Sequence, residues 1–305
     1  DWILYSPSVM YSVSLLIRLL SQPHDKVLTM NPMYDAFINV IKENDRELLS
    51  HHLIKEEGTF KIDFDVFEKQ AQESTLLLLC APHNPTGRIW SDEQMHRMIE
   101  ICKKYQVKII SDEIHMDIRI KDAKHHPLMK YYDEYKDIFT ASSSSKTLNT
   151  PGLIGSYVII PDEKIRDEFL GVTRRRDFLN SASIFGMYAT MIGYTECDDY
   201  IDQLNEYICG NMELVENFIR DELKDFKFQR PEATYLAWID ARDVPFTSDE
   251  IQDALVNVGG VAIMKGEIYG ENGAKYLRMN LGCPRSKIEE GLKRFKKAMD
   301  YLYNK

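Results

Sequence analysis

Short apolar runs alternate with amphipathic stretches over the first 160 residues, and this alternation limits the fold more than any other feature of the sequence. The short apolar run at 75–80 is typical of a strand buried on both faces of a sheet, and VKII at 107–110 is expected to be the next strand. Between them, apolar residues recur at helical spacing, as over 8–20 and 91–105. Strands that alternate with helices predict an α/β fold, with a mostly parallel sheet sandwiched by helices. Further strands are expected at 27–30, 138–140 and 155–160, and a further helix at 34–43.

The pattern changes in the last third of the chain. A long helical stretch over 196–223 is followed by few strand-like runs. This predicts a smaller α+β unit, and we place the boundary along the long helix, near residue 200. The expected organisation is a large domain over 1–200 and a small C-terminal domain over 201–305. In the small domain, strands are expected at 235–240, 261–266 and 276–282, and helices at 248–258 and 286–303.

Composition excludes several classes of protein. A chain of 305 residues with 44% hydrophobic residues can bury a large core. Its net charge of -10 argues against a nucleic-acid or anionic-membrane surface, and the short basic cluster 174–176 is expected to be a solvated helix face. Neither a membrane-spanning run nor a signal peptide is evident, so a soluble cytoplasmic protein is expected.

Cysteine and histidine patterns offer no metal site. The five cysteines are scattered without a C-x-x-C pair, which is typical of reduced thiols in a cytosol. The histidine pairs 51–52 and 125–126 lack other ligand types at metal spacing, and we expect them at the surface. No metal is therefore predicted.

Polar residues with matching chemistry follow three of the expected strands. Asn84 follows the first in HNPTGR, Asp112 follows the second with His115 three residues on, and Lys146 comes after four serines. In doubly wound sheets the residues just beyond the strand ends face one crevice. Short serines let the backbone approach a phosphate, a lysine amine condenses with an aldehyde, and a buried carboxylate keeps a pyridine nitrogen protonated. Pyridoxal phosphate (PLP) presents all three groups.

Each of these features also has an ordinary interpretation. A serine run with one lysine is often a solvated loop, NPTG is a common turn, and an acidic residue at a strand end is often a cap. Their occurrence together, in this order, favours a cofactor site.

The chain resembles a known family at these positions. HNPTGR, SDEIH, SSSSK and YLRMNLG are similar to the signature positions of fold type I, aspartate aminotransferase-like PLP enzymes. More narrowly, YSPSV, NPMYDAF, SDEIHMD, ATYLAWID and NLGCPRSK resemble the cystathionine β-lyase subgroup that includes the maltose-regulon modulator. The resemblance runs over essentially the whole chain. It implies PLP as the cofactor and an amino acid as the small-molecule substrate.

The resemblance also implies roles for individual residues. Lys146 would bind PLP covalently and then take the Cα proton of the substrate. Asp112 would pair with the pyridine nitrogen, and Arg278 would clamp the substrate carboxylate through two parallel hydrogen bonds. The remaining residues would hold the cofactor: Asn84 and His115 at the phenolic oxygen, Tyr34 on the ring face, and Ser143, Ser145 and the amides of Val9 and Met10 at the phosphate.

Two departures from the family pattern bear on function. Many aminotransferases of this fold carry a phosphate-binding arginine eight residues past the lysine, and here that position is Ile154. The absence favours a lyase over a transaminase. Relatives also carry a substantial segment before YSPSV that contributes to the small domain and reaches across a dimer. Its absence here puts activity of this chain in doubt.

The expected reaction is α,β-elimination, in which a β-substituted cysteine such as L-cystathionine yields a thiol, pyruvate and ammonia. Transamination uses the same residues and stays open. A third possibility is regulation through protein contact, since the subgroup includes a protein that binds a transcription factor. A cofactor-free relative is disfavoured by the intact Lys146, Asp112, Asn84 and Arg278. A homodimer is expected from the resemblance alone.

Overall fold

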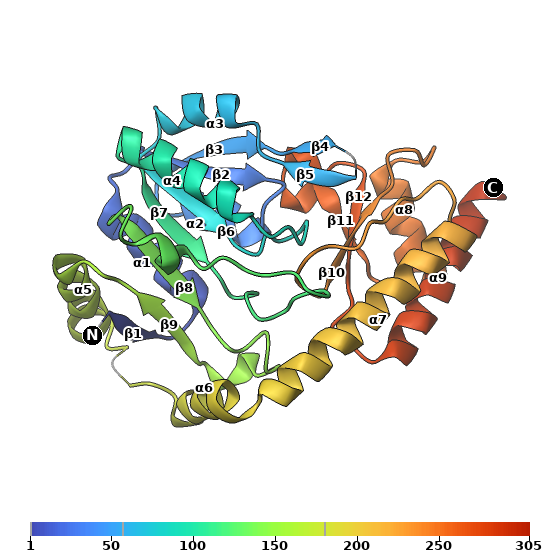
Figure 1. Ribbon diagram of the computed structural model, residues 1–305. Coiled ribbons are helices and arrows are strands. Elements are labelled where there is room, and N and C mark those ends of the chain that lie inside the picture. The colour runs from blue at the N-terminus through green and yellow to red at the C-terminus, as the bar shows by residue number, and fades with distance from the viewer. Residues whose placement is uncertain (1, 57, 180) are drawn as a thin grey trace.

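The computed structural model describes residues 2–56, 58–179 and 181–305. Its centre is a seven-stranded sheet in which β9 alone runs against its neighbours, so the expected mostly parallel sheet is confirmed (Figure 1). In sheet order the strands are β1 (Ile3–Ser6), β9 (Ser156–Ile159), β8 (Ile138–Ser142), β7 (Lys108–Asp112), β6 (Leu76–Cys80), β2 (Lys26–Asn31) and β3 (Glu47–His52).

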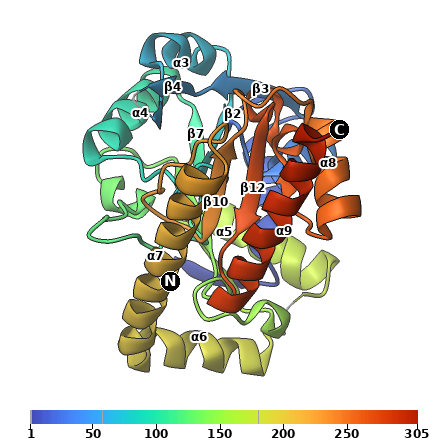
Figure 2. The same ribbon diagram turned by 90° about the vertical axis from the view of Figure 1, so that its right-hand side faces the viewer.

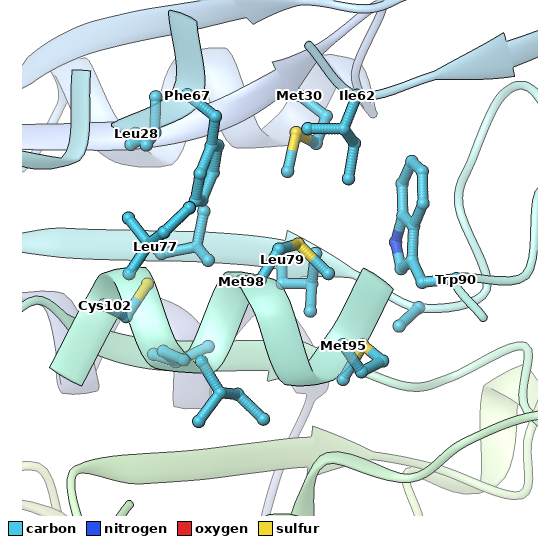
Figure 3. Close-up of a cluster of buried hydrophobic side chains, with 14 of the residues drawn as sticks. Leu28, Met30, Ile62, Phe67, Leu77, Leu79, Trp90, Met95, Met98 and Cys102 are labelled. Atoms are coloured by element: carbon cyan, nitrogen blue, oxygen red, sulfur yellow. The ribbon is translucent and has the colours of Figure 1, made fainter. Parts of the chain in front are cut away.

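The apolar run of β6 supplies both faces of this sheet. Leu77 and Leu79 enter a core with α3 (Phe64–Ala71) and α4 (Asp92–Tyr105), as Figure 3 shows. Leu76 and Leu78 enter the opposite core, together with side chains of three other helices. Successive side chains of a strand point to opposite faces, so a strand covered on both sides must be apolar throughout. The helices of the second core are α1 (Val9–Leu20), α2 (Asp35–Lys42) and α5 (Glu163–Leu170).

Capping residues fix where the helices begin. The Ser8 side chain accepts a hydrogen bond from the Tyr11 amide and starts α1. Ser91 and Gln94 form a capping box at the start of α4, each side chain bonding the other's backbone amide. Side-chain oxygens at these positions satisfy amides that have no partner within the helix.

The C-terminal part of the chain forms a three-stranded antiparallel sheet backed by long helices (Figure 2). Its strands are β10 (Leu236–Asp240), β12 (Tyr276–Asn280) and β11 (Met264–Lys265), with β12 in the middle. The helices are α7 (Asp198–Glu222), α8 (Ser248–Ala254) and α9 (Arg285–Tyr303), and α6 (Ile184–Glu196) connects them to the first part. Trp238 on β10 lies directly opposite Arg278 on β12.

The two sheets exchange side chains across their boundary. Ile118 and Ile120 pack into the core of the C-terminal part, whereas Trp238, Tyr269 and Tyr276 pack into a core of the large sheet. The long helix α7 begins at Asp198, beside the expected boundary. The division at residue 200 stays a prediction.

Several elements have no counterpart among the expected ones. These are β1, β3, α3, α5, α6 and the hairpin of β4 (Ile54–Glu56) and β5 (Thr59–Lys61). Short 3₁₀ segments lie at Leu128–Tyr131, Pro151–Leu153, Gly266–Tyr269 and Glu271–Gly273, and π-helical turns lie at Gly171–Arg176 and Leu255–Gly259.

The expectation of surface histidines is wrong at two positions. His51 is fully buried and its Nδ1 lies 2.8 Å from the Gln70 side chain. His125 is nearly buried and its Nε2 lies 3.2 Å from Glu113. In both cases a polar partner nearby offsets part of the free-energy cost of burying the imidazole. None of the described helices is both long enough and apolar enough to cross a membrane.

Candidate active site

The predicted site residues come together around one cavity. It has a volume of about 320 Å³ and lies beyond the carboxyl ends of β6, β7 and β8, between the two sheets. Parallel strands in such a fold bring their carboxyl ends to one edge of the sheet. All ten predicted residues line the cavity: Val9, Met10, Tyr34, Asn84, Asp112, His115, Ser143, Ser145, Lys146 and Arg278.

Asp112 ends β7 with its carboxylate buried and without a charged partner. Only 4% of the residue is exposed, and Oδ1 accepts a hydrogen bond from the Ile114 amide at 3.1 Å. Within the described residues no cation lies within 4 Å of it. Burial raises the pKa of this carboxyl from 3.8 to about 7. The site therefore holds an acid that gains stability when a cation or a protonated ring nitrogen is placed against it.

A hydrogen bond joins the two sheets at the cavity. Arg278 Nη1 donates to Asn84 Oδ1 at 3.2 Å, and the Arg278 guanidinium lies 4.5 Å from the centre of the Tyr269 ring. The Asn84 oxygen is thus engaged, which leaves its amide hydrogens to donate to another acceptor in the cavity. The arginine keeps further donors for a carboxylate.

His115 lies in the wall as a neutral imidazole. It is buried, its Nδ1 has no hydrogen-bond partner among the described residues, and its ring meets Tyr235 edge-on at 5.6 Å. Burial, with the nearby charges of Lys146 and Arg278, lowers the pKa of His115 to about 3. A neutral imidazole can donate to a phenolic oxygen or accept from it.

Lys146 follows β8 and presents its side chain to the cavity. The residue is exposed, and no carboxylate of the described chain lies within 4 Å of its amine. Three residues earlier in the serine run, Ser143 donates its hydroxyl to the Gly155 carbonyl and accepts from the Ser145 amide at 3.1 Å. The serine loop is thus held by its own hydrogen bonds, which place the lysine at the cavity.

An adjoining cavity of about 260 Å³ lies on the other side of Lys146. It shares Ser145, Lys146 and Tyr235 with the first, and its wall includes Tyr200 and Tyr207 of α7. A ligand whose reacting carbon lies at the lysine amine therefore has room to extend into either cavity.

The start of α1 also lines the cavity. The Tyr11 amide bonds to the Ser8 side chain and the Ser12 amide bonds to the Ser8 carbonyl. The amides of Val9 and Met10 line the cavity without an acceptor from the described residues. Unpaired amides and the helix dipole both favour a phosphate at this position.

Sequence reasoning missed part of the wall. Tyr235 and Asn280 line the cavity, and their signal was their place at the start of one expected strand and within another. Ile154, which stands where many aminotransferases have an arginine, also lines the cavity, with a φ of 54°. Tyr34 is half-buried immediately before α2, which is compatible with the predicted stacking on a ring.

These residues fit PLP. A buried, uncompensated carboxylate suits the ring nitrogen, unpaired helix amides suit the phosphate, a free amide and a neutral imidazole suit the phenolic oxygen, and a free amine suits the aldehyde. In the described part of the chain, no group of three metal-ligating side chains competes as a functional centre.

A family model for aminotransferase class I and II matches residues 1–295. The chain belongs to this family. The resemblance seen in the sequence is therefore confirmed.

Two relatives lie in the expected subgroup. Cystathionine β-lyase PatB of Bacillus subtilis is 34% identical over 97% of this chain and 77% of its own length. MalY of Escherichia coli is 35% identical over 95% of this chain and 74% of its own length.

Solved structures of the family confirm the fold. A PLP-bound putative aminotransferase from Clostridium difficile matches 98% of this chain and 77% of its own, with a TM-score of 0.95 and 37% identity. Cystalysin of Treponema denticola, which contains a PLP cofactor, matches 99% of this chain and 77% of its own, with a TM-score of 0.94 and 29% identity. This aminotransferase-family chain thus has the predicted α/β architecture.

Proposed function

We propose that the protein is a PLP-dependent carbon–sulfur β-lyase that cleaves L-cystathionine or related cysteine S-conjugates. The observation that carries this proposal is a single cavity that holds the free amine of Lys146, the buried carboxylate of Asp112 and the guanidinium of Arg278. Relatives named cystathionine β-lyase and PLP-bound structures of the same fold support it.

Different residues of the cavity wall would hold different parts of PLP. Asp112 would face the pyridine nitrogen, Asn84 and His115 the phenolic oxygen, and Tyr34 the ring face. The phosphate would lie at the unpaired amides of Val9 and Met10, with Ser143 and Ser145 on the other side of it. Because Ser143 already donates to Gly155, its contribution would come from fixing the loop and from one remaining lone pair.

When bound, PLP supplies an electron sink for the charge left on the substrate α-carbon. Arg278 binds the substrate carboxylate, and Lys146 removes the proton from Cα as a general base. Asp112 holds a proton at the ring nitrogen throughout. The Cβ–S bond then breaks, and sulfur leaves with the bonding electrons as a thiolate. Hydrolysis of the remaining three-carbon product by one water gives pyruvate and ammonia.

The test is pyruvate release from L-cystathionine by the PLP-loaded protein, without any keto acid present. We expect stoichiometric pyruvate and thiol, and an unchanged rate when a keto acid is added. No pyruvate from L-cystathionine or other β-substituted cysteines would contradict the proposal. A reaction that proceeds only when a keto acid is supplied would instead assign transamination, the alternative that the family description keeps open.

We also propose a homodimer that covers α6. This helix presents Ile184, Phe185 and Met191 to solvent with exposed fractions of 67%, 76% and 59%. Patches of large apolar side chains on this scale mark interaction surfaces. Gly186 of α6 packs against the carbonyls of Leu153 and Ile154, so a copy seated here would lie beside the cavity wall.

The dimer is tested by sedimentation of the purified protein. Wild type is expected at twice the chain mass of 35.6 kDa, and Phe185→Glu combined with Met191→Glu is expected to shift it toward the monomer. Val66→Glu, at an exposed apolar residue of α3, is the matched control and should leave the mass unchanged. A wild-type monomer at micromolar concentration would overturn this proposal.

We place the protein in the cytoplasm. All five cysteines are free, and Cys80 and Cys102 are buried, which suits a reducing compartment. Cell fractionation followed by immunodetection tests the assignment, and recovery in an exported fraction would contradict it.

A further inference from the structure

A second and larger cleft lies between the β4–β5 hairpin and strand β10. Its volume is about 620 Å³, and it shares no lining residue with the candidate active site. Its walls are the β4–β5 hairpin, the turn that carries Thr86 and Arg88, the segment 227–232 and strand β10. The mechanism proposed above makes no use of these residues.

Positive charge is in excess in this cleft, although the whole chain has a net charge of -10. Lys55 and Arg242 both pair with the buried carboxylate of Asp240, at 2.7 and 2.8 Å, and Arg88 pairs with Glu232 at 2.6 Å. Three cations therefore share two carboxylates. The other two lining cations, Lys227 and Arg230, are paired with acids that do not line the cleft.

Two buried hydrogen-bond donors in these walls have no acceptor. The indole Nε1 of Trp238 and the Nε of Arg88 are both buried without a partner in the described part of the chain. Trp238 is only 7% exposed, and its ring stacks on Tyr276 at 5.0 Å. Buried donors are nearly always paired, so two unpaired ones in one cleft indicate a missing acceptor.

We propose that this cleft binds a small phosphorylated molecule. Phosphate oxygens supply several acceptors on one group, which matches the unpaired donors of Arg88 and Trp238. The negative charge of the group is met by the surplus among Lys55, Arg88 and Arg242. Phe60 gives the cleft an apolar face for the rest of the ligand.

An occupant of the cleft contacts the structure that shapes the active site. Arg88 belongs to the same tight turn as Asn84, and this turn is closed by a hydrogen bond between the His83 amide and the Arg88 carbonyl. Trp238 meets Tyr269 edge-on at 5.5 Å, and Tyr269 lies under the Arg278 guanidinium. The ligand would thus contact the turn that carries Asn84 and, through Tyr269, lie one residue away from Arg278.

Calorimetric titration with inorganic pyrophosphate tests the proposal. The protein is first saturated with PLP and reduced with borohydride, so that the phosphate site of the other cavity stays filled, and ionic strength is held constant with sodium chloride. We expect one saturable site per chain. Arg88→Gln is expected to weaken binding by about 10-fold, because it removes a charge-assisted hydrogen bond.

Lys164→Gln is the matched control, at an exposed cation on α5, and should bind as wild type does. If Arg88→Gln fails to melt cooperatively, Arg242→Gln replaces it, since this half-exposed side chain leaves Asp240 paired with Lys55. Absence of saturable heat with wild type overturns the proposal, as does equal affinity in the cleft variant and the Lys164→Gln control.

Discussion

Replacing Lys146 with alanine is expected to lower kcat for elimination by roughly 10²–10⁴-fold through loss of the general base alone. Borohydride should also no longer fix PLP to the protein, because the amine that lines both adjoining cavities is gone. Pyruvate release gives the rate, and mass spectrometry of the peptide that contains residue 146 gives the covalent cofactor.

Lys164→Ala, at an exposed lysine on α5 that lines neither cavity, is the control and should retain both properties. PLP trapped at another lysine in the Lys146→Ala protein would remove the residue from its proposed role. The variant also tests the regulatory alternative, since a regulatory effect that persists without turnover would have to come from protein contact.

Asp112→Asn is expected to have opposite effects on activity and on stability. With PLP bound, the carboxylate–ring nitrogen contact is lost, and kcat should fall by roughly 10- to 100-fold, as for a hydrogen bond between charged groups. Without PLP, the variant should be more stable than wild type above pH 7, because it no longer buries an unpaired carboxylate.

The pH dependence of the cofactor-free protein follows from the raised pKa. Asp112 has a pKa of about 7 in the folded chain and about 3.8 when exposed, because burial disfavours its charged form. Between these two pH values the folded state binds more protons at this group than the unfolded state does. The free energy of unfolding therefore falls as pH rises, by roughly 1.4 kcal/mol per pH unit. Above pH 7 its contribution is constant.

Urea unfolding of the cofactor-free protein at pH 4.5, 6 and 8 measures this slope. Asp112→Asn is expected to flatten it, whereas Asp122→Asn, at an exposed carboxylate, serves as the control and should leave it in place. Identical slopes for wild type and Asp112→Asn would show that the buried carboxyl finds a compensating partner.

The large sheet and the polar residues beyond its strands could be predicted from local sequence patterns. Strand β6 is apolar throughout because both of its faces are covered, and such a continuous apolar run can be recognised in the sequence alone. Strand β3, ELLSHH, has mixed polarity because it lies at the sheet edge and is largely half-exposed. It gave no such signal and was missed.

Contacts between distant parts of the chain could not be predicted from local patterns. Arg278 and Asn84 are 194 residues apart, and their hydrogen bond depends on how the two sheets meet. Burial of His51 likewise depends on Gln70, which a neighbouring helix brings to it. Family resemblance predicted that Arg278 binds the substrate. The cleft lined by Arg88 and Trp238, in contrast, could be found only in the three-dimensional structure.

The contacts that restrain Arg278 have an entropic consequence for the substrate binding that we propose. A free arginine side chain loses roughly 2 kcal/mol of rotamer freedom when it is fixed. Here Asn84 and the Tyr269 ring restrict the guanidinium before any ligand arrives. Much of that ordering therefore occurs when the protein folds, and in the proposed role of Arg278 an incoming carboxylate would meet a donor that is already oriented. The proposed site would then gain affinity for the amino acid by preorganisation, without an additional contact.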